Sequence, residues 1–104
     1  LKDGTDDYTY LHLLKTHIYK LINEVKPGFA FFLSGVDILA TDKFGKLKVT
    51  MGGCKQRDEI VFSTLQKHAI PCVVAMGGGY SADIKIIVEA HCNTFRMAKD
   101  IYKL

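Results

Sequence analysis

The sequence has few prolines and cysteines, and this limits the classes of protein to which it can belong. There is no tryptophan among 104 residues, and there are only two prolines and three cysteines. With 48% hydrophobic and 24% charged residues, this composition describes one globular unit rather than a disordered or fibrous chain. The three cysteines form no C-x-x-C pair, so we interpret Cys54, Cys72 and Cys92 as reduced, packed thiols of a cytoplasmic protein.

Three patterns that mark other partners are also missing. No apolar stretch approaches the ~20 residues that span a bilayer, and no basic-then-apolar secretory signal is present. The net charge is only +3, and the basic residues are scattered along the chain instead of forming a stripe. We therefore expect neither a membrane nor a nucleic acid as a direct partner.

Apolar residues at helical spacing predict a first helix from Asp6 or Asp7 to Pro27. The run "FAFFL" at 29–33 is too short for a helix and predicts a strand covered on both faces, and "CVVAM" at 72–76 repeats this pattern. Between them, Thr50 can cap a second helix that ends near Lys67.

A third helix is expected after the second strand, with Ser81 as its cap. The residues predicted on its apolar face are Ile84, Ile87, Val88, His91, Phe95 and Ala98. The order is then helix, strand, helix, strand, helix, which indicates an α/β fold with parallel strands. Because two parallel strands leave edges and faces bare, and because the chain opens at Leu1 in a polar loop, we expect a piece of a larger domain.

Two unusual loops follow the two strands. Residues 34–47, "SGVDILATDKFGKL", contain Asp37 and Asp42, and residues 77–82, "GGGYSA", contain Tyr80. Ligands of open α/β sheets bind beyond the carboxyl ends of the strands, and neighbouring strands lie about 4.8 Å apart. Asp42 and Tyr80 are therefore predicted to face one small ligand, whereas Asp37 is interpreted as a structural loop residue.

One reading of the glycine-rich loop is a phosphate site. Residues 77–82 satisfy G-x-G-x-x-A between a strand and a helix, which is the context of a dinucleotide fingerprint, and a helix start favours anions. The acidic residue expected about 20 positions later, at the end of another strand, is missing. A nucleotide-binding domain stays open as an alternative.

Several spaced motifs in order resemble a known family. "SGVDILATDKFGKL", "GCKQRDEIVF" and "GGGYSADIKIIVEAHCNTFR" are similar to the carboxyl-terminal portion of the histone deacetylase family, closest to its class IV branch and bacterial relatives. The resemblance covers almost the whole chain. It implies that residues 1–104 are a carboxyl-terminal fragment of one deacetylase catalytic domain, with part of the three-layer α/β/α parallel sheet of the arginase/deacetylase fold.

Carried over residue by residue, the resemblance makes Asp42 a zinc ligand and Tyr80 the catalytic phenol that hydrogen-bonds the acyl oxygen. Gly77, Gly78 and Gly79 would then pass beside the acyl-lysine channel and bind substrate. These residue types suit the chemistry, because catalytic zinc takes a carboxylate ligand and leaves a position open. A phenol can donate to an oxyanion as it develops.

The same resemblance places other functional groups upstream of this chain. The paired histidines and the Asp-x-His zinc ligands of the family have no match here, and "TDKFG" departs from many relatives on both sides of the ligand. His12, His17, His68 and His91 are interpreted as surface, helix-end or core residues. The implied partners are an acylated lysine or amine, and the upstream segment of the same domain. Self-association of the chain and a catalytically inactive assembly module remain alternatives.

Overall fold

The computed structural model describes residues 1–104 and contains three helices and two strands. The elements are α1 (Asp7–Val25), β1 (Ala30–Gly35), α2 (Met51–Lys67), β2 (Cys72–Gly77) and α3 (Ile84–Tyr102). This is the order predicted from the sequence, and the α/β class is confirmed. None of the helices is both long and apolar enough to cross a membrane.

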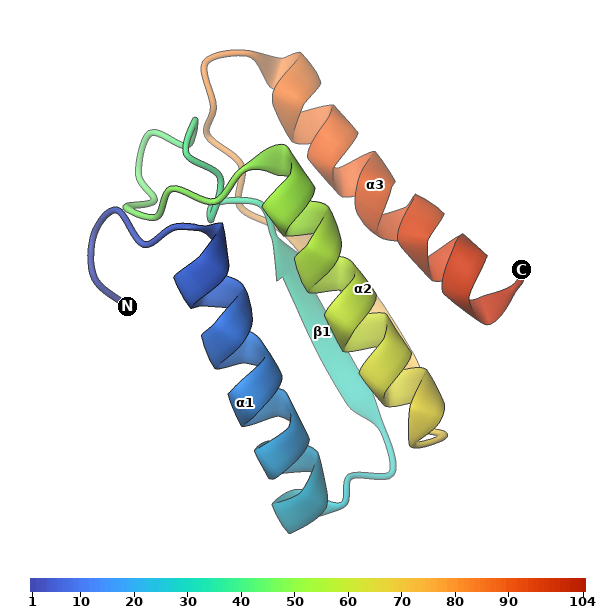
Figure 1. The fold of residues 1–104 in the computed structure, drawn as a ribbon. Coiled ribbons are helices and arrows are strands. Elements are labelled where there is room, and N and C mark those ends of the chain that lie inside the picture. Colours follow the sequence, from blue (N-terminus) through green and yellow to red (C-terminus); the bar gives the residue numbers. More distant parts are fainter.

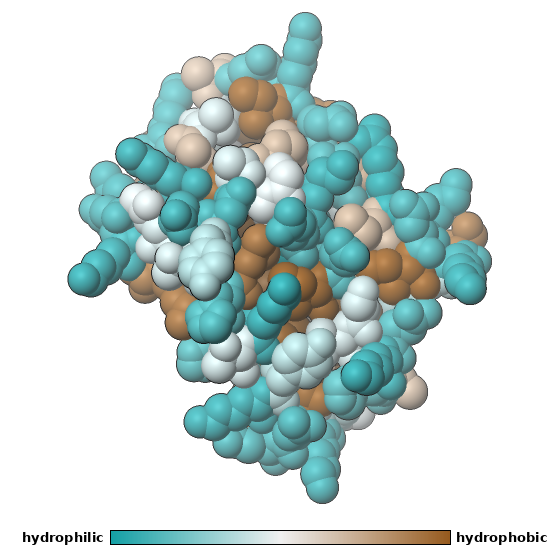
Figure 2. All heavy atoms as spheres, viewed as in Figure 1, coloured by the Kyte–Doolittle hydropathy of each residue, from teal (hydrophilic) through white to brown (hydrophobic).

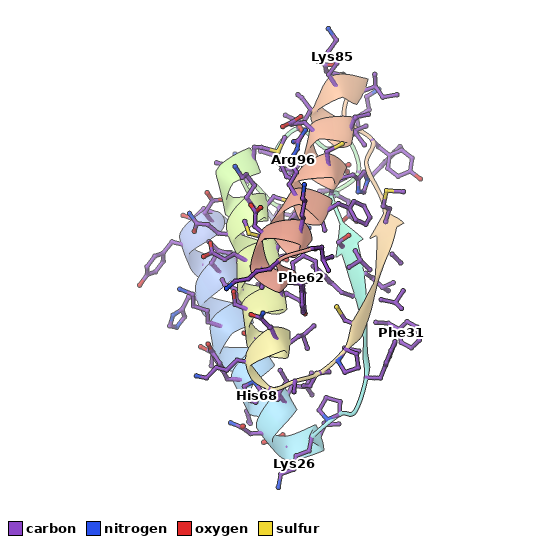
Figure 3. All side chains as sticks on the ribbon, turned by 90° about the vertical axis from the view of Figure 1, so that its right-hand side faces the viewer. Lys26, Phe31, Phe62, His68, Lys85 and Arg96 are labelled. Atoms are coloured by element: carbon purple, nitrogen blue, oxygen red, sulfur yellow. The ribbon has the colours of Figure 1, made fainter.

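The two strands are parallel neighbours, and their register pairs Ala30 with Cys72 and Gly35 with Gly77. The strands therefore end together, and their following loops leave from one edge of the sheet. Figure 1 shows these loops meeting at the end of the molecule where α2 and α3 begin. Lys26 and His68 lie at the opposite end (Figure 3).

Two caps agree with the sequence and one does not. The Asp6 side chain accepts from the Thr9 N–H at the start of α1, and Thr50 accepts from the Gly53 N–H at the start of α2. The third helix begins at Ile84 with Asp83 as its cap, so the prediction of Ser81 is wrong. Ser81 instead forms a β-bridge with Asp42, which places it in the loop rather than at the helix.

The helices cover one face of the sheet. Ile22 of α1 and Val61 and Leu65 of α2 form a buried cluster against the inward-facing Phe32. Phe62 of α2 contacts the rings of Phe32 and of Tyr102 in α3 at centroid distances of 5.4 and 6.0 Å. In Figure 3 Phe62 lies between helices and strands.

The other face of the sheet is bare in this chain. Phe31 and Leu33 are each 76% exposed, and Phe31 points away from the helices (Figure 3). The prediction that "FAFFL" and "CVVAM" are covered on both faces is therefore wrong for this chain, because no second layer of helices lies against them. The helical side carries mostly hydrophilic residues, with apolar side chains visible between the helices (Figure 2).

The buried side of α3 also differs from its apolar stripe. Ile84, Val88 and Phe95 are exposed, whereas the buried residues are Ala90, Asn93 and Thr94. Small and hydrogen-bonding residues face α2 because the two helices pack closely and share a polar contact between Asp58 and Thr94. His91, expected to be a satisfied core residue, is half-buried and its Nδ1 has no hydrogen-bond partner.

Candidate active site

The loop after β1 and the loop after β2 are joined at the carboxyl edge of the sheet. The Lys43 N–H donates to the Tyr80 carbonyl at 3.2 Å. The hydroxyls of Thr41 and Ser81 lie 2.8 Å apart, and Asp42 and Ser81 form an antiparallel bridge. Asp42 and Tyr80, which are 38 positions apart in sequence, are thus brought together, as the strand order predicted.

The Asp42 carboxylate is the centre of this junction. Its Oδ2 accepts from the N–H groups of Gly45 and Phe44 at 2.6 and 3.0 Å, and its Oδ1 accepts from the Tyr80 N–H at 2.8 Å. Burial by itself raises the pKa of Asp42, but the hydrogen bonds from Gly45, Tyr80 and Phe44 outweigh it and hold the pKa below the ordinary 3.8. The side chain is therefore an anion at neutral pH although it is only 8% exposed.

A carboxylate has about four acceptor positions, and three of those of Asp42 are occupied by backbone amides. The remaining position lies on Oδ1, so Asp42 fits the part of a single ligand to a hard or borderline cation. Catalytic zinc takes three protein ligands, and no group of three His, Cys, Asp or Glu side chains in the chain is placed to hold a metal. The residues present thus fit one position of such a site and not a whole site.

The Tyr80 side chain is exposed to solvent and its ring contacts Phe44. The side chain is 57% exposed, and its ring meets the edge of Phe44 at a centroid distance of 5.1 Å and an interplanar angle of 77°. Phe44 follows Asp42 by two residues and is itself 71% exposed. The two loops therefore contribute one aromatic ring each to the rim around Asp42.

Two of the three glycines have a backbone that other residues rarely adopt. Gly78 has φ of 65° and Gly79 has φ of 106°, and a Cβ on Gly79 would lie 2.8 Å from Ile87 Cγ2. Gly77 ends β2 with open space at its Cβ position. The sharp turn that aims the Tyr80 N–H at Asp42 therefore needs Gly78 and Gly79.

The other residues weighed from the sequence have structural places. Asp37 is exposed in the first loop, beside Gly78. His12 and His17 are exposed on α1, and His68 ends α2 with its Nδ1 2.8 Å from the Thr64 carbonyl. All three cysteines are free, with Cys54 buried and the other two half-buried.

A buried charged pair behind the site was missed by the sequence reasoning. Arg57 and Asp58 of α2 are 4% and 0% exposed, and Arg57 Nε lies 2.8 Å from Asp58 Oδ1. Burial alone lowers the pKa of Arg57, but Cys54 and Asp58 nearby raise it. The sequence offered one signal of this pair, because Arg57 and Asp58 are adjacent among the apolar residues of the helix. An adjacent Arg-Asp pair is usually exposed to solvent, and only the packing of α2 shows that this one is buried.

Asp58 is the one carboxylate that forms a salt bridge with Arg57. The Cys54 thiol and the Tyr10 phenol also lie near the guanidinium, and burial raises the pKa of each. Arg57 opposes both shifts without reversing either. One arginine charge is therefore balanced by one carboxylate.

Comparison with known proteins gives a consistent family. The family model described as the histone deacetylase domain matches residues 1–95. An uncharacterized protein of Picosynechococcus sp. is 37% identical over 102 residues, which are 98% of this chain and 34% of that protein. Histone deacetylase 9 of Arabidopsis thaliana is 32% identical over 83 residues, which are 80% of this chain and 18% of that protein.

A solved structure has the same fold. Acetylpolyamine aminohydrolase from Burkholderia pseudomallei superimposes with a TM-score of 0.80 at 16% identity, covering 97% of this chain and 28% of that one. At this identity the likeness establishes the fold alone. The chain thus spans about a third or less of the length of the proteins it matches.

Proposed function

The chain belongs to the histone deacetylase domain family, and we propose that it is the carboxyl-terminal part of a zinc-dependent deacetylase that hydrolyses the amide of an acyl-lysine or a similar acylated amine. The observation on which this rests is the junction of Asp42 and Tyr80 at the carboxyl edge of the sheet. It puts an ionised carboxylate with a free acceptor position in contact with the backbone of Tyr80, whose side chain is exposed.

In this proposal Asp42 is one of three protein ligands, and the other two come from outside residues 1–104. The three amides that bind the carboxylate keep it ionised and fix its orientation, so a metal ion meets an oxygen that is already placed. When bound, zinc activates water and polarises the amide carbonyl. Because the chain alone supplies one ligand, we expect it to bind zinc weakly and to hydrolyse nothing by itself.

Tyr80 is the proposed catalytic phenol. Its hydroxyl donates a hydrogen bond to the acyl oxygen, and this bond strengthens as negative charge develops on that oxygen. Its backbone is held by Asp42 and Lys43, and its ring rests against Phe44. These contacts reduce the freedom of the ring before substrate arrives. Gly77, whose Cβ position is open, leaves room for the acyl chain, whereas Gly78 and Gly79 are needed for the turn that precedes Tyr80.

The nucleotide-binding alternative is less favoured by the same contacts. A phosphate loop directs free backbone N–H groups at the anion. Here the Tyr80 N–H donates to the Asp42 carboxylate, and that negative charge repels a phosphate. An assembly module without catalysis has no feature of the loops in its favour.

The direct test is turnover by the full-length protein. We expect release of free amine from an acetyl-lysine peptide or from an N-acetylated diamine, loss of that activity after chelation, and its return when zinc is added back. A zinc-loaded protein that hydrolyses neither substrate would refute the proposal. Comparing the two substrates also separates a protein deacetylase from a small-amine deacetylase.

A further inference from the structure

The buried guanidinium of Arg57 contacts the edge of the sheet from which both site loops leave. Its Nη1 donates to the Gly35 carbonyl at 2.6 Å, while its Nε binds Asp58 and its Nη2 lies 3.5 Å from Cys54 Sγ. One fork of donors thus joins a helix to the last residue of β1. Its Cζ also lies 5.4 Å from the centroid of the Phe32 ring, on the inward face of the sheet.

Gly35 is a sensitive position for the site. It pairs in register with Gly77, and the next residue, Val36, donates its N–H to the Gly77 carbonyl at 3.2 Å. The loop to Asp42 begins after Gly35, and the loop to Tyr80 begins after Gly77. A shift of the Gly35 carbonyl therefore changes the start of both loops together.

Asp58 connects the same arginine to α3. Its Oδ1 binds Arg57, and its Oδ2 accepts from the Thr94 hydroxyl at 2.7 Å. Since α3 begins directly after the Tyr80 loop, the Arg57–Asp58 pair connects the end of β1 with the helix that follows this loop. No exposed side chain is needed for this connection, because Arg57, Asp58 and Thr94 are all buried.

Stability alone does not explain an ion pair at this place. Replacing a buried pair by apolar residues of similar size is often neutral or stabilising, because desolvation offsets the attraction of the charges. An arginine offers several donors in a rigid plane, which a lysine cannot reproduce. Because one of these donors binds the Gly35 carbonyl, the arginine fixes the position of the end of β1.

We propose that Arg57 is a positioning residue for the active site, acting through the Gly35 carbonyl on the geometry of Asp42 and Tyr80. This inference rests on the proposed function for its effect on catalysis. Its effect on the two loops is independent of any activity.

The test uses Arg57→Lys in the full-length protein, with Arg96→Lys as the matched control. Lysine keeps a positive charge beside Asp58. It lacks the planar set of donors with which the guanidinium binds Asp58 and the Gly35 carbonyl at the same time. Arg96 is an exposed arginine of α3 whose side-chain hydrogen bonds go to Glu89 and Asn93 of the same helix. We expect Arg57→Lys to lower kcat at least about tenfold with KM little changed, as for a small misplacement of catalytic groups, and Arg96→Lys to leave both unchanged.

Hydrogen exchange gives a readout that does not depend on turnover. Peptides covering residues 42–46 and 78–82 contain the amides that bind Asp42, and we expect them to exchange about tenfold faster in Arg57→Lys. Peptides from α1 serve as the internal reference and should not change. If the wild-type protein hydrolyses no acylated amine, the proposed function fails, and these exchange rates still decide the role of Arg57.

A second variant guards against misfolding. Arg57→Met with Asp58→Asn removes both charges together, leaves an acceptor for Thr94 and avoids an unpaired buried charge. If Arg57→Lys does not fold, the double variant should fold and show the same loss of kcat and the same faster exchange. Wild-type kcat and wild-type exchange in whichever variant folds would overturn the proposal and leave Arg57 as a buried counter-ion of Asp58.

Discussion

Asp42 accepts hydrogen bonds from three backbone amides, and these bonds exist at full strength only while its carboxyl group is ionised. The pKa of Asp42 is depressed in the folded protein, so the carboxyl group stabilises the fold above its unfolded-state pKa near 3.8. That contribution is lost as the pH falls below about 4 and through the folded-state pKa. Protonation of Asp42 is thus expected to weaken the junction of the two site loops in acid.

Asp42→Asn tests this statement. The amide places an N–H₂ group where the backbone offers only donors, so at pH 7 we expect a loss of about 1–3 kcal/mol in the free energy of unfolding. The difference from wild type should shrink when unfolding by urea is measured near pH 3. Asp37→Asn, at an exposed carboxylate of the same loop, should leave the free energy of unfolding at pH 7 as in wild type; an equal loss there would contradict the role given to Asp42.

At the scale of the helices and strands, the sequence predicted the features that depend on residues close together in the chain. Helical spacing, the caps Asp6 and Thr50 and the two apolar runs place all five elements, because these signals act within a few residues. The start of α3 was misplaced, because Ser81 and Asp83 are both good caps and the choice depends on the contact of Ser81 with the other loop.

Long-range packing was not predictable in the same way. Three residues of the predicted apolar stripe of α3 are exposed, and the buried side of the helix instead includes Thr94, which donates to Asp58. The positions of Asp42 and Tyr80 followed from parallel strands that end together. The backbone amides that hold Asp42, and the contact of Arg57 with Gly35, arise only when loops from distant parts of the chain meet.

The turn after β2 offers a test at this scale. In Gly79→Ala a Cβ must fit at φ of 106° against Ile87 and Val36, so we expect a loss of at least about 1–2 kcal/mol in the free energy of unfolding. Gly77→Ala is the matched control, because nothing lies within 4 Å of its Cβ position. Thermal or urea unfolding of the two variants measures the difference, and equal effects would contradict a conformational role for Gly79.

At the scale of the whole molecule, apolar side chains are exposed both on the bare face of the sheet and along the β1 edge beside α1. An apolar groove of about 480 Å³ lies between α1 and β1. Exposed apolar residues along it are Leu21, Val25, Phe29, Phe31 and Leu33. A patch of this kind is typical of a surface that another part of a protein covers, and in the proposed parent that part is the upstream segment of the same domain.

The 104-residue chain on its own is therefore expected to associate with itself. Light scattering should give a mass above that of one chain, and Phe31→Glu should shift it toward the monomer because it buries a charge in the contact. Tyr8→Glu is the control, since Tyr8 is 80% exposed at the start of α1, outside the groove. A wild-type chain that stays monomeric on concentration would count against this use of the exposed apolar surface.

The central claim is that Asp42 and Tyr80 have different roles in one site, and metal content measured with turnover in the full-length protein tests it most directly. Asp42→Ala should lose zinc and activity together, because it removes one of three ligands. Tyr80→Phe removes only a hydroxyl, so zinc should stay bound while kcat on an acetyl-lysine substrate falls roughly 10²- to 10³-fold. Full zinc in Asp42→Ala, or undiminished kcat in Tyr80→Phe, would contradict the account.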